Sequence, residues 1–146
     1  MATASVAIHM AVLIPQLRRI PQIAAYFGIP AQRVREVLDT LVRAGLVHET
    51  GETFKIGETR AHLGNDSPSI SKHHTNWRLQ ALASLDLDRP SDLHYSSVVT
   101  VSEADAPKIR EILVKTIEEI RRAIRPSADE ALYAYCIDWF GLKKND

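Results

Sequence analysis

The sequence has a single cysteine, Cys136, among its 146 residues, so no disulfide can form within one chain. This usage is typical of proteins from a reducing cytosol, and we expect a cytoplasmic protein. Long apolar runs are also missing. The stretch 6–13 is interrupted by His9 and is shorter than the ~20 residues that span a bilayer. It also lacks the basic start of a signal peptide, so we expect no membrane association.

Catalytic and metal-binding signatures are missing as well. There is no phosphate-binding glycine loop, no Gly-x-Ser-x-Gly elbow and no His-Glu-x-x-His. The histidines at 73–74 have no partners at a recognised zinc-ligand spacing. The acidic turn 86–92 begins like a calcium loop, but Ser91 and Ser97 stand where glycine and glutamate are required. Cys136 lies in an apolar-aromatic run, as a buried structural thiol does. We therefore expect a protein that is not an enzyme and needs no metal or cofactor.

The chain has no excess of either charge, because 18 Lys and Arg residues balance 18 Asp and Glu residues. Proteins devoted to nucleic acid usually carry an excess of positive charge. The balance is uneven along the chain. Residues 1–63 carry seven basic against five acidic side chains (+2), and residues 64–146 carry eleven against thirteen (−2). Any DNA binding must therefore come from a local basic patch, and the asymmetry favours the N-terminal part.

The stretch 21–45 predicts two helices separated by a tight turn. Pro21 suits the first turn of a helix, and Gly28 closes one cheaply in the left-handed conformation. Pro30 suits the start of a second, longer helix. Four apolar residues of that longer helix are spaced to share one face: Val34, Val37, Leu38 and Leu41. Gly45 ends it.

These helices belong to a larger pattern. Residues 6–17 predict a preceding helix, which Pro15 weakens near its end. The runs 46–49 and 53–56 flank a Thr-Gly-Glu turn and predict a β-hairpin. Three helices followed by a hairpin predict a winged helix-turn-helix, whose longer helix enters the DNA major groove. Residues 21–56 resemble the common bacterial winged-helix pattern, including its Phe-Gly-Ile turn and Gly-Leu-Val strand entry.

The exposed side of the longer helix supplies the candidate DNA contacts. Arginine can bind guanine with two hydrogen bonds and glutamine can bind adenine in the same way, while cations near the hairpin can contact phosphates. The candidates are Gln32, Arg33, Arg35, Thr40, Arg43, Lys55 and Arg60. Four acidic residues lie on or near the same surface: Glu36, Asp39, Glu49 and Glu52. Because they oppose phosphate binding, a winged helix used for protein contact remains the alternative.

The second half has a different composition. The polar residues 58–67 predict a linker, followed by a helix from Ser67 to about Leu85. The runs 94–101 and 132–140 read as strands, and a long amphipathic helix lies between Asp105 and Pro126. Its apolar stripe comprises Ile109, Ile112, Leu113, Thr116, Ile117, Ile120 and Ile124. Two strands alone are marginally stable, so we expect this half to mediate self-association or to bind a protein partner.

The whole chain resembles a family of bacterial conserved-hypothetical proteins, in which a winged helix precedes a C-terminal domain of unknown function. The carrying segments are residues 23–47, the Asn-Asp-Ser-Pro junction, "HYSSVVTVS" and "LYAYCIDWFGL". The resemblance implies a regulator-like architecture. We therefore expect an α+β protein: a winged helix-turn-helix (1–63) and a small α/β domain (64–146) with the long helix between two strands.

From this architecture we expect a DNA-binding, transcriptional-regulator-like protein. A homodimer would place two winged helices on one double-stranded DNA and offset the weak local charge. The alternative is an interaction or signalling adaptor that uses the same fold to contact protein and does not bind DNA.

Overall fold

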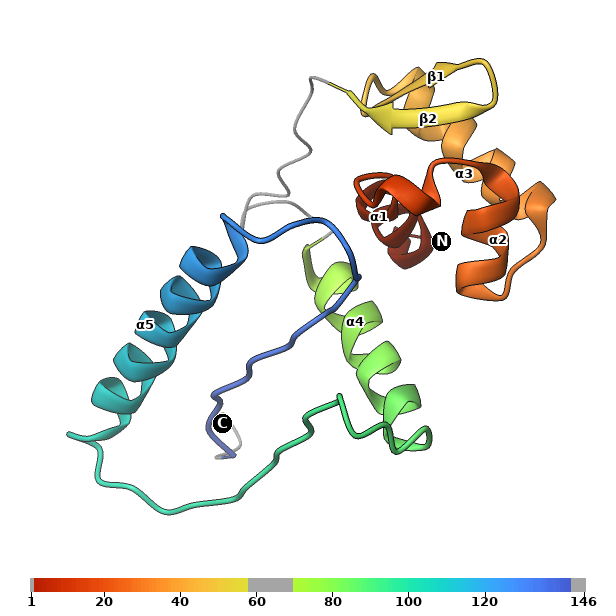
Figure 1. The fold of residues 1–146 in the computed structure, drawn as a ribbon. Helices are drawn as coiled ribbons and strands as arrows, with labels where there is room; N and C mark the ends of the chain where they lie inside the picture. The colour runs from red at the N-terminus through yellow and green to blue at the C-terminus, as the bar shows by residue number, and fades with distance from the viewer. Residues whose placement is uncertain (1, 58–69, 143–146) are drawn as a thin grey trace. The chain divides into compact units, whose positions relative to one another are not determined.

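The computed structural model describes residues 2–57 and 70–142. Within these ranges the protein is mixed α+β, with five α-helices, one short 3-10 helix and a two-stranded antiparallel sheet (Figure 1). The described residues form two compact units. Unit 1 holds the residues up to Gln80 together with Asp129–Ala134, and unit 2 holds Ala81–Ala128 and the residues from Tyr135 on. The expected division at residues 63 and 64 stays a prediction.

Three helices open the chain: α1 (Ala2–Ala11), α2 (Ile20–Phe27) and α3 (Ala31–Arg43). The prediction of one helix over residues 6–17 is wrong in its second half. There α1 ends at Ala11, and a separate 3-10 helix, η1 (Pro15–Leu17), follows. The reason is Pro15, which has no backbone N–H to continue the α-helical ladder and fits only at the start of the next turn.

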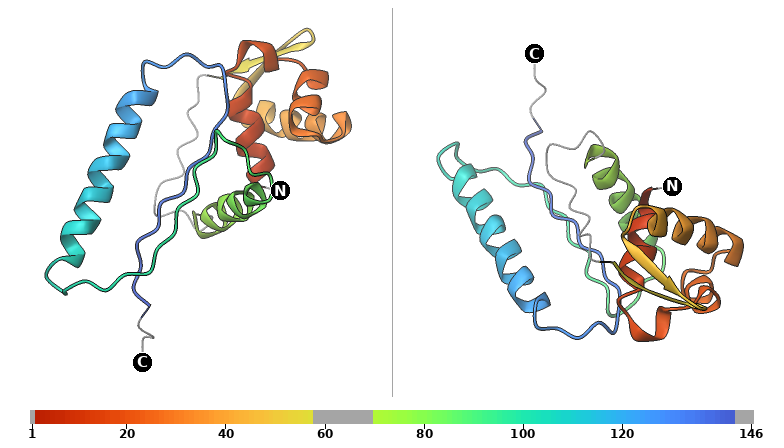
Figure 2. Two further views of the ribbon diagram at one scale, coloured as in Figure 1. Left: turned by 60° about the horizontal axis from the view of Figure 1, so that its bottom comes forward. Right: turned by 90° about the horizontal axis from the view of Figure 1, so that it is seen from above.

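The core of unit 1 lies where these three helices meet the hairpin. Helix α3 packs against α1, α2 and the first strand, as the arrangement in Figure 2 shows. The buried apolar side chains of the described chain are Ile8, Ala11, Val12, Ile14, Leu17, Ile23, Val34, Val37, Leu38, Leu41, Val47 and Phe54. The four apolar residues predicted to share one face of α3 are all among them. Each large side chain of this set contributes ~1.5–3 kcal/mol by leaving water.

The predicted hairpin is present as β1 (Val47–Thr50) and β2 (Thr53–Ile56). The strands pair antiparallel with Val47 opposite Ile56 and Thr50 opposite Thr53, and Gly51 takes a φ of 60° in the turn. Two further hydrogen bonds fix the hairpin to the helices. The Phe54 N–H donates to the Arg18 carbonyl at 2.8 Å, and the His9 ring donates through Nε2 to the Leu46 carbonyl at 3.1 Å.

Gly28 sets the angle between α2 and α3. It adopts a left-handed φ of 63°, and its N–H donates to the carbonyl of Ala24. An added Cβ would meet no atom within 4 Å, so only backbone strain opposes a side chain here. We expect Gly28→Ala to lower the free energy of unfolding by about 1 kcal/mol, measured by urea denaturation. Gly28→Asn should lose less, since asparagine tolerates this conformation. Equal losses in both variants would contradict the strain argument.

The second half contains α4 (Ile70–Leu85) and α5 (Ala106–Ile124). The bounds of α5 agree with the prediction: Asp105 precedes it, Pro107 lies in its first turn, and it ends just before Pro126. Its apolar stripe does not form a buried core, because no residue of α5 is buried. No helix in the described ranges combines the length and the apolar character needed to cross a membrane.

The prediction of strands over residues 94–101 and 132–140 is wrong. Within the described chain neither segment belongs to a strand, and the one sheet is the β1–β2 hairpin. A β-strand requires a hydrogen-bonded partner as well as β-branched residues, and these segments have no ladder to join. Their side chains are correspondingly open, with Tyr95 88% and Val98 83% exposed. Leu132 is different, since it packs against the core of unit 1.

Candidate nucleic-acid interface

Helix α3 divides into a buried face and a polar face. Because its apolar side chains recur at steps of three and four, the positions opposite them share the outer side of the helix. The centre of this polar face is formed by Gln32, Glu36, Asp39 and Arg43. Arg33 and Arg35 lie on its two flanks. The candidate interface therefore has acidic residues at its middle, between the predicted DNA contacts.

Two of the predicted contacts are held in ion pairs. Arg33 lies 2.9 Å from the Glu36 carboxylate, one helical turn away, and both side chains are well exposed. Such exposed pairs contribute little to stability, about 0–1 kcal/mol. The guanidinium of Arg33 is thus free to exchange this carboxylate for another anion at little cost.

Arg35 is held more firmly. Its Nη1 lies 2.8 Å from a carboxylate oxygen of Glu49 on β1 and 3.5 Å from one of Asp39, and its guanidinium lies 5.4 Å from the centre of the Phe54 ring. The hydrogen bond to Glu49 is the main reason that the pKa of Arg35 is raised above its ordinary value. Arg35 thus connects α3 to the hairpin, and its contact with DNA stays a prediction.

Arg43 is less constrained. Its Nη2 donates to the Thr40 hydroxyl at 3.2 Å, and that hydroxyl donates to the Glu36 carbonyl at 2.9 Å. In the described part of the chain, no carboxylate forms an ion pair with Arg43. Its charge therefore remains available on the outer side of α3, while Thr40 is engaged with the helix backbone. Gln32 is exposed in the first turn of the same helix.

The hairpin presents Lys55 on its outer face. Directly opposed residues of an antiparallel pair point to the same side, and Lys55 is opposite His48. Both are exposed, whereas Phe54 and Val47 turn toward the core. Lys55 thus projects away from the packed side of the hairpin, as a phosphate contact requires. The remaining predicted contact, Arg60, lies outside the described residues.

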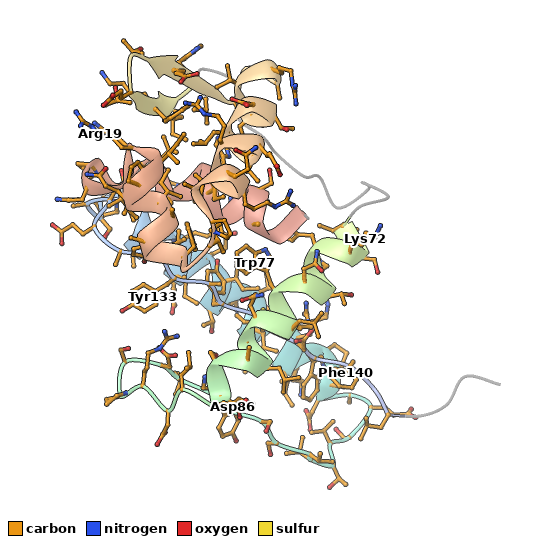
Figure 3. The ribbon with its side chains drawn as sticks, turned by 90° about the vertical axis from the view of Figure 1, so that its right-hand side faces the viewer. Arg19, Lys72, Trp77, Asp86, Tyr133 and Phe140 are labelled. Carbon is orange, nitrogen blue, oxygen red and sulfur yellow. The ribbon has the colours of Figure 1, made fainter. Side chains whose placement is uncertain are left out.

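Sequence reasoning missed one basic residue near the hairpin. Arg19 precedes α2, and its side chain is 55% exposed (Figure 3). It lies 3.7 Å from Glu52 in the hairpin turn, a long and exposed ion pair. The Arg18 carbonyl that binds Phe54 places Arg19 close to the hairpin. No local pattern in the sequence reveals this proximity, because 33 positions separate the two partners.

The two arginine pairs on α3 should differ measurably in strength. In a double-mutant cycle, Arg35→Ala with Glu49→Ala should give a coupling energy of about 0.5–1 kcal/mol, from urea unfolding. The matched cycle of Arg33→Ala with Glu36→Ala should give about 0.3 kcal/mol, as exposed pairs within one helix do. A larger coupling for the second cycle would contradict the assignment of Arg35 as the connection between helix and hairpin.

The described residues offer no metal-binding group beside this interface. Within residues 2–57 and 70–142, no group of three or more His, Cys, Asp or Glu side chains is placed to hold an ion. His73 and His74 stack edge-on, and His73 also meets Trp77 at 6.1 Å between ring centres. These rings form an aromatic contact along α4.

Comparison with known proteins places the chain in one family. The family model described as "Domain of unknown function (DUF4423)" matches residues 4–142, which is nearly the whole chain. No curated protein and no solved structure matches it.

Proposed function

We propose that this chain, which belongs to the DUF4423 family of domains of unknown function, is a DNA-binding protein of the transcriptional-regulator type. In this proposal residues 2–57 form a winged helix-turn-helix. The observation that carries it is the order of packed elements, in which α2, the Gly28 turn, α3 and the hairpin share one core. That packing leaves one whole face of α3 polar and exposed, as a recognition helix requires.

The dimensions of α3 fit a major groove. Its 13 residues form a rod ~20 Å long and, with side chains, ~10–12 Å across. The major groove of B-DNA is ~12 Å wide, so the diameter of the helix matches the width of the groove. Gln32, in the first turn, is positioned like the residues that meet base edges at the N-terminus of a recognition helix. Arg43, at the other end, and Lys55, on the hairpin, would bind phosphates. Together with Arg33, these are the contacts that we retain from the sequence prediction.

The arginines on the flanks of α3 take different roles in the proposal. Arg33 would leave Glu36 for a phosphate, since an exposed pair costs little to break. Arg35 would stay with Glu49 and hold the hairpin beside α3. Thr40 would act on Arg43 through their hydrogen bond and would not contact a base.

A second function is favoured by one observation, the mixed charge of the α3 face. Glu36 and Asp39 lie at its centre, and phosphate neutralisation supplies most nonspecific DNA affinity. A polar face of mixed sign is also suited to binding another protein. In that case the chain would be an interaction or signalling adaptor that does not bind DNA.

Titration of a fluorescently labelled random-sequence duplex with the full chain distinguishes the two functions. We expect the anisotropy to rise with a dissociation constant of roughly 10⁻⁶–10⁻⁴ M near physiological salt, and the affinity to fall as salt increases. If the chain fails to bind duplex even at low salt, the DNA-binding function is wrong and the adaptor function takes its place.

A further inference from the structure

The exposed apolar residues gather in the second half of the chain. Of the large apolar side chains that are exposed in the described ranges, only Met10 and Tyr26 precede residue 79. The others are Leu79, Leu82, Leu85, Leu87, Leu93, Tyr95, Val98, Val99, Val101, Ile112, Val114, Ile124, Tyr133, Tyr135, Trp139, Phe140 and Leu142. All of these except Leu79 and Tyr133 belong to unit 2. Monomeric proteins rarely expose large contiguous apolar patches, so the places in unit 2 where such residues meet are candidates for an interface.

Part of this surface is a groove within unit 2. Val98, Val99 and Val101 line one side, and an aromatic-rich segment that includes Trp139 and Phe140 lines another, around a cavity of about 320 Å³. Phe140 is 73% exposed and is labelled in Figure 3. The walls of the groove are mostly apolar, and Ser97 and Asp138 are the polar residues among them.

Helix α5 adds a second apolar surface in the same unit. Ile112 is 60% and Ile124 is 55% exposed. Several charges of the helix are paired with one another, with Lys115 2.8 Å from Glu111 and Arg121 3.0 Å from Glu118. Lys108 and Lys115, one turn before and after Ile112, and Glu119, two turns after it, share the side of the helix that Ile112 occupies, so a covering surface must leave room for these charges.

The extent of this surface indicates a stable interface. A half-exposed side chain of this size presents roughly 100 Å² of apolar area, so the six exposed apolar residues of the groove together with Ile112 present on the order of 700 Å². A standard interface covers about 800 Å² on each partner, which is close to this area. Residues 70–142 carry nine basic and eleven acidic side chains, a formal charge of −2, so two copies would repel each other only weakly.

Two described segments of the second half have the composition of strands but do not pair in a sheet. The segments 94–101 and 135–142 are rich in β-branched and aromatic residues, yet neither is part of a strand. Two such segments are too few for a stable sheet, whereas two copies of the chain supply four. Each chain carries both the groove and the Ile112 side of α5. In a two-fold dimer the two copies use the same surfaces, so each copy can cover the apolar surface of the other.

We propose that the groove of unit 2 and the Ile112 side of α5 form the interface with a second copy of this chain, in a two-fold symmetric dimer. Each copy would cover the apolar surface of the other, so that Val98 and Phe140 become buried on association. This interface does not depend on whether α3 binds DNA.

Sedimentation-equilibrium ultracentrifugation of the full chain tests the proposal. We expect the wild type to be a dimer at micromolar concentration. Val98→Asp and Ile112→Glu should each raise the dissociation constant at least tenfold, because each places a charge in the interface. The matched control is Met10→Glu, which puts the same charge at an exposed apolar position of α1 and should leave the dissociation constant within threefold of the wild type.

The result that would overturn the proposal is a wild type that stays monomeric at about 100 μM, or a dimer that both unit 2 variants leave intact. Both substituted residues are mostly exposed in the single chain, so their monomers should keep the circular dichroism of the wild type. If one variant loses that signal, the dissociation constant of the other variant and the mass of the wild type still test the proposal.

Discussion

Replacing Phe54 with alanine is expected to lower the free energy of unfolding by about 3–5 kcal/mol, because it leaves a cavity at the centre of unit 1. Phe54 is the largest fully buried side chain of the described residues. It lies on β2, its backbone N–H binds the Arg18 carbonyl, and its ring lies below the Arg35 guanidinium. Its loss should therefore loosen the hairpin from the helices. Urea denaturation followed by circular dichroism at a fixed protein concentration measures the effect.

Tyr26→Ala is the matched control for this prediction. Tyr26 is an aromatic residue of the same unit, but it is 48% exposed on α2. Its replacement should cost less than about 1 kcal/mol, as substitutions away from the core do. If Phe54→Ala cost no more than Tyr26→Ala, the hairpin would not be part of the core, and the proposed winged arrangement would be wrong.

Reversing the charge of two residues should weaken DNA binding at least a hundredfold at low salt. The double variant carries Arg43→Glu and Lys55→Glu, which replaces two cations that have no carboxylate partner among the described residues. Each lost phosphate contact should also reduce the slope of log affinity against log salt by about one. Fluorescence anisotropy with a labelled duplex at several salt concentrations measures both quantities.

The control for the reversal has the same change in net charge. Lys72→Glu with Arg110→Glu alters two exposed cations on α4 and α5. We expect this pair to reduce the affinity less than fivefold, since only general electrostatic attraction changes. An equal loss in the two double variants would mean that binding depends on net charge and not on the face formed by α3 and the hairpin.

Local chemistry explains why much of unit 1 was predictable from the sequence. Gly28 has the left-handed conformation that its place after an apolar segment predicted, and the four apolar residues of α3 are buried as their spacing predicted. The hairpin follows from two short β-type runs around Gly51. Each of these inferences depends on residues a few positions apart, whose conformational preferences the sequence shows directly. The winged helix as a fold, and its use, stay predictions.

Contacts between distant residues explain what the sequence did not reveal. The pairing of Arg35 with Glu49, 14 positions away on another element, was not predicted, and the contact of Arg35 with DNA stays a prediction. The runs at 94–101 and 132–140 have the composition of strands, but pairing depends on what lies beside them in space. The position of α5 and its amphipathic character were predicted from the spacing of its apolar residues. That spacing does not show which surface, if any, packs against the apolar side.

Backbone NMR of the ¹⁵N-labelled full chain, recorded while a short duplex is added at low salt, tests the central claim most directly. We expect the largest shifts of amide signals at Gln32, Arg43 and Lys55, with little change along α5. A duplex that shifts mainly the signals of residues 70–142, or shifts none, would contradict the proposal that α3 and the hairpin form a DNA-binding face.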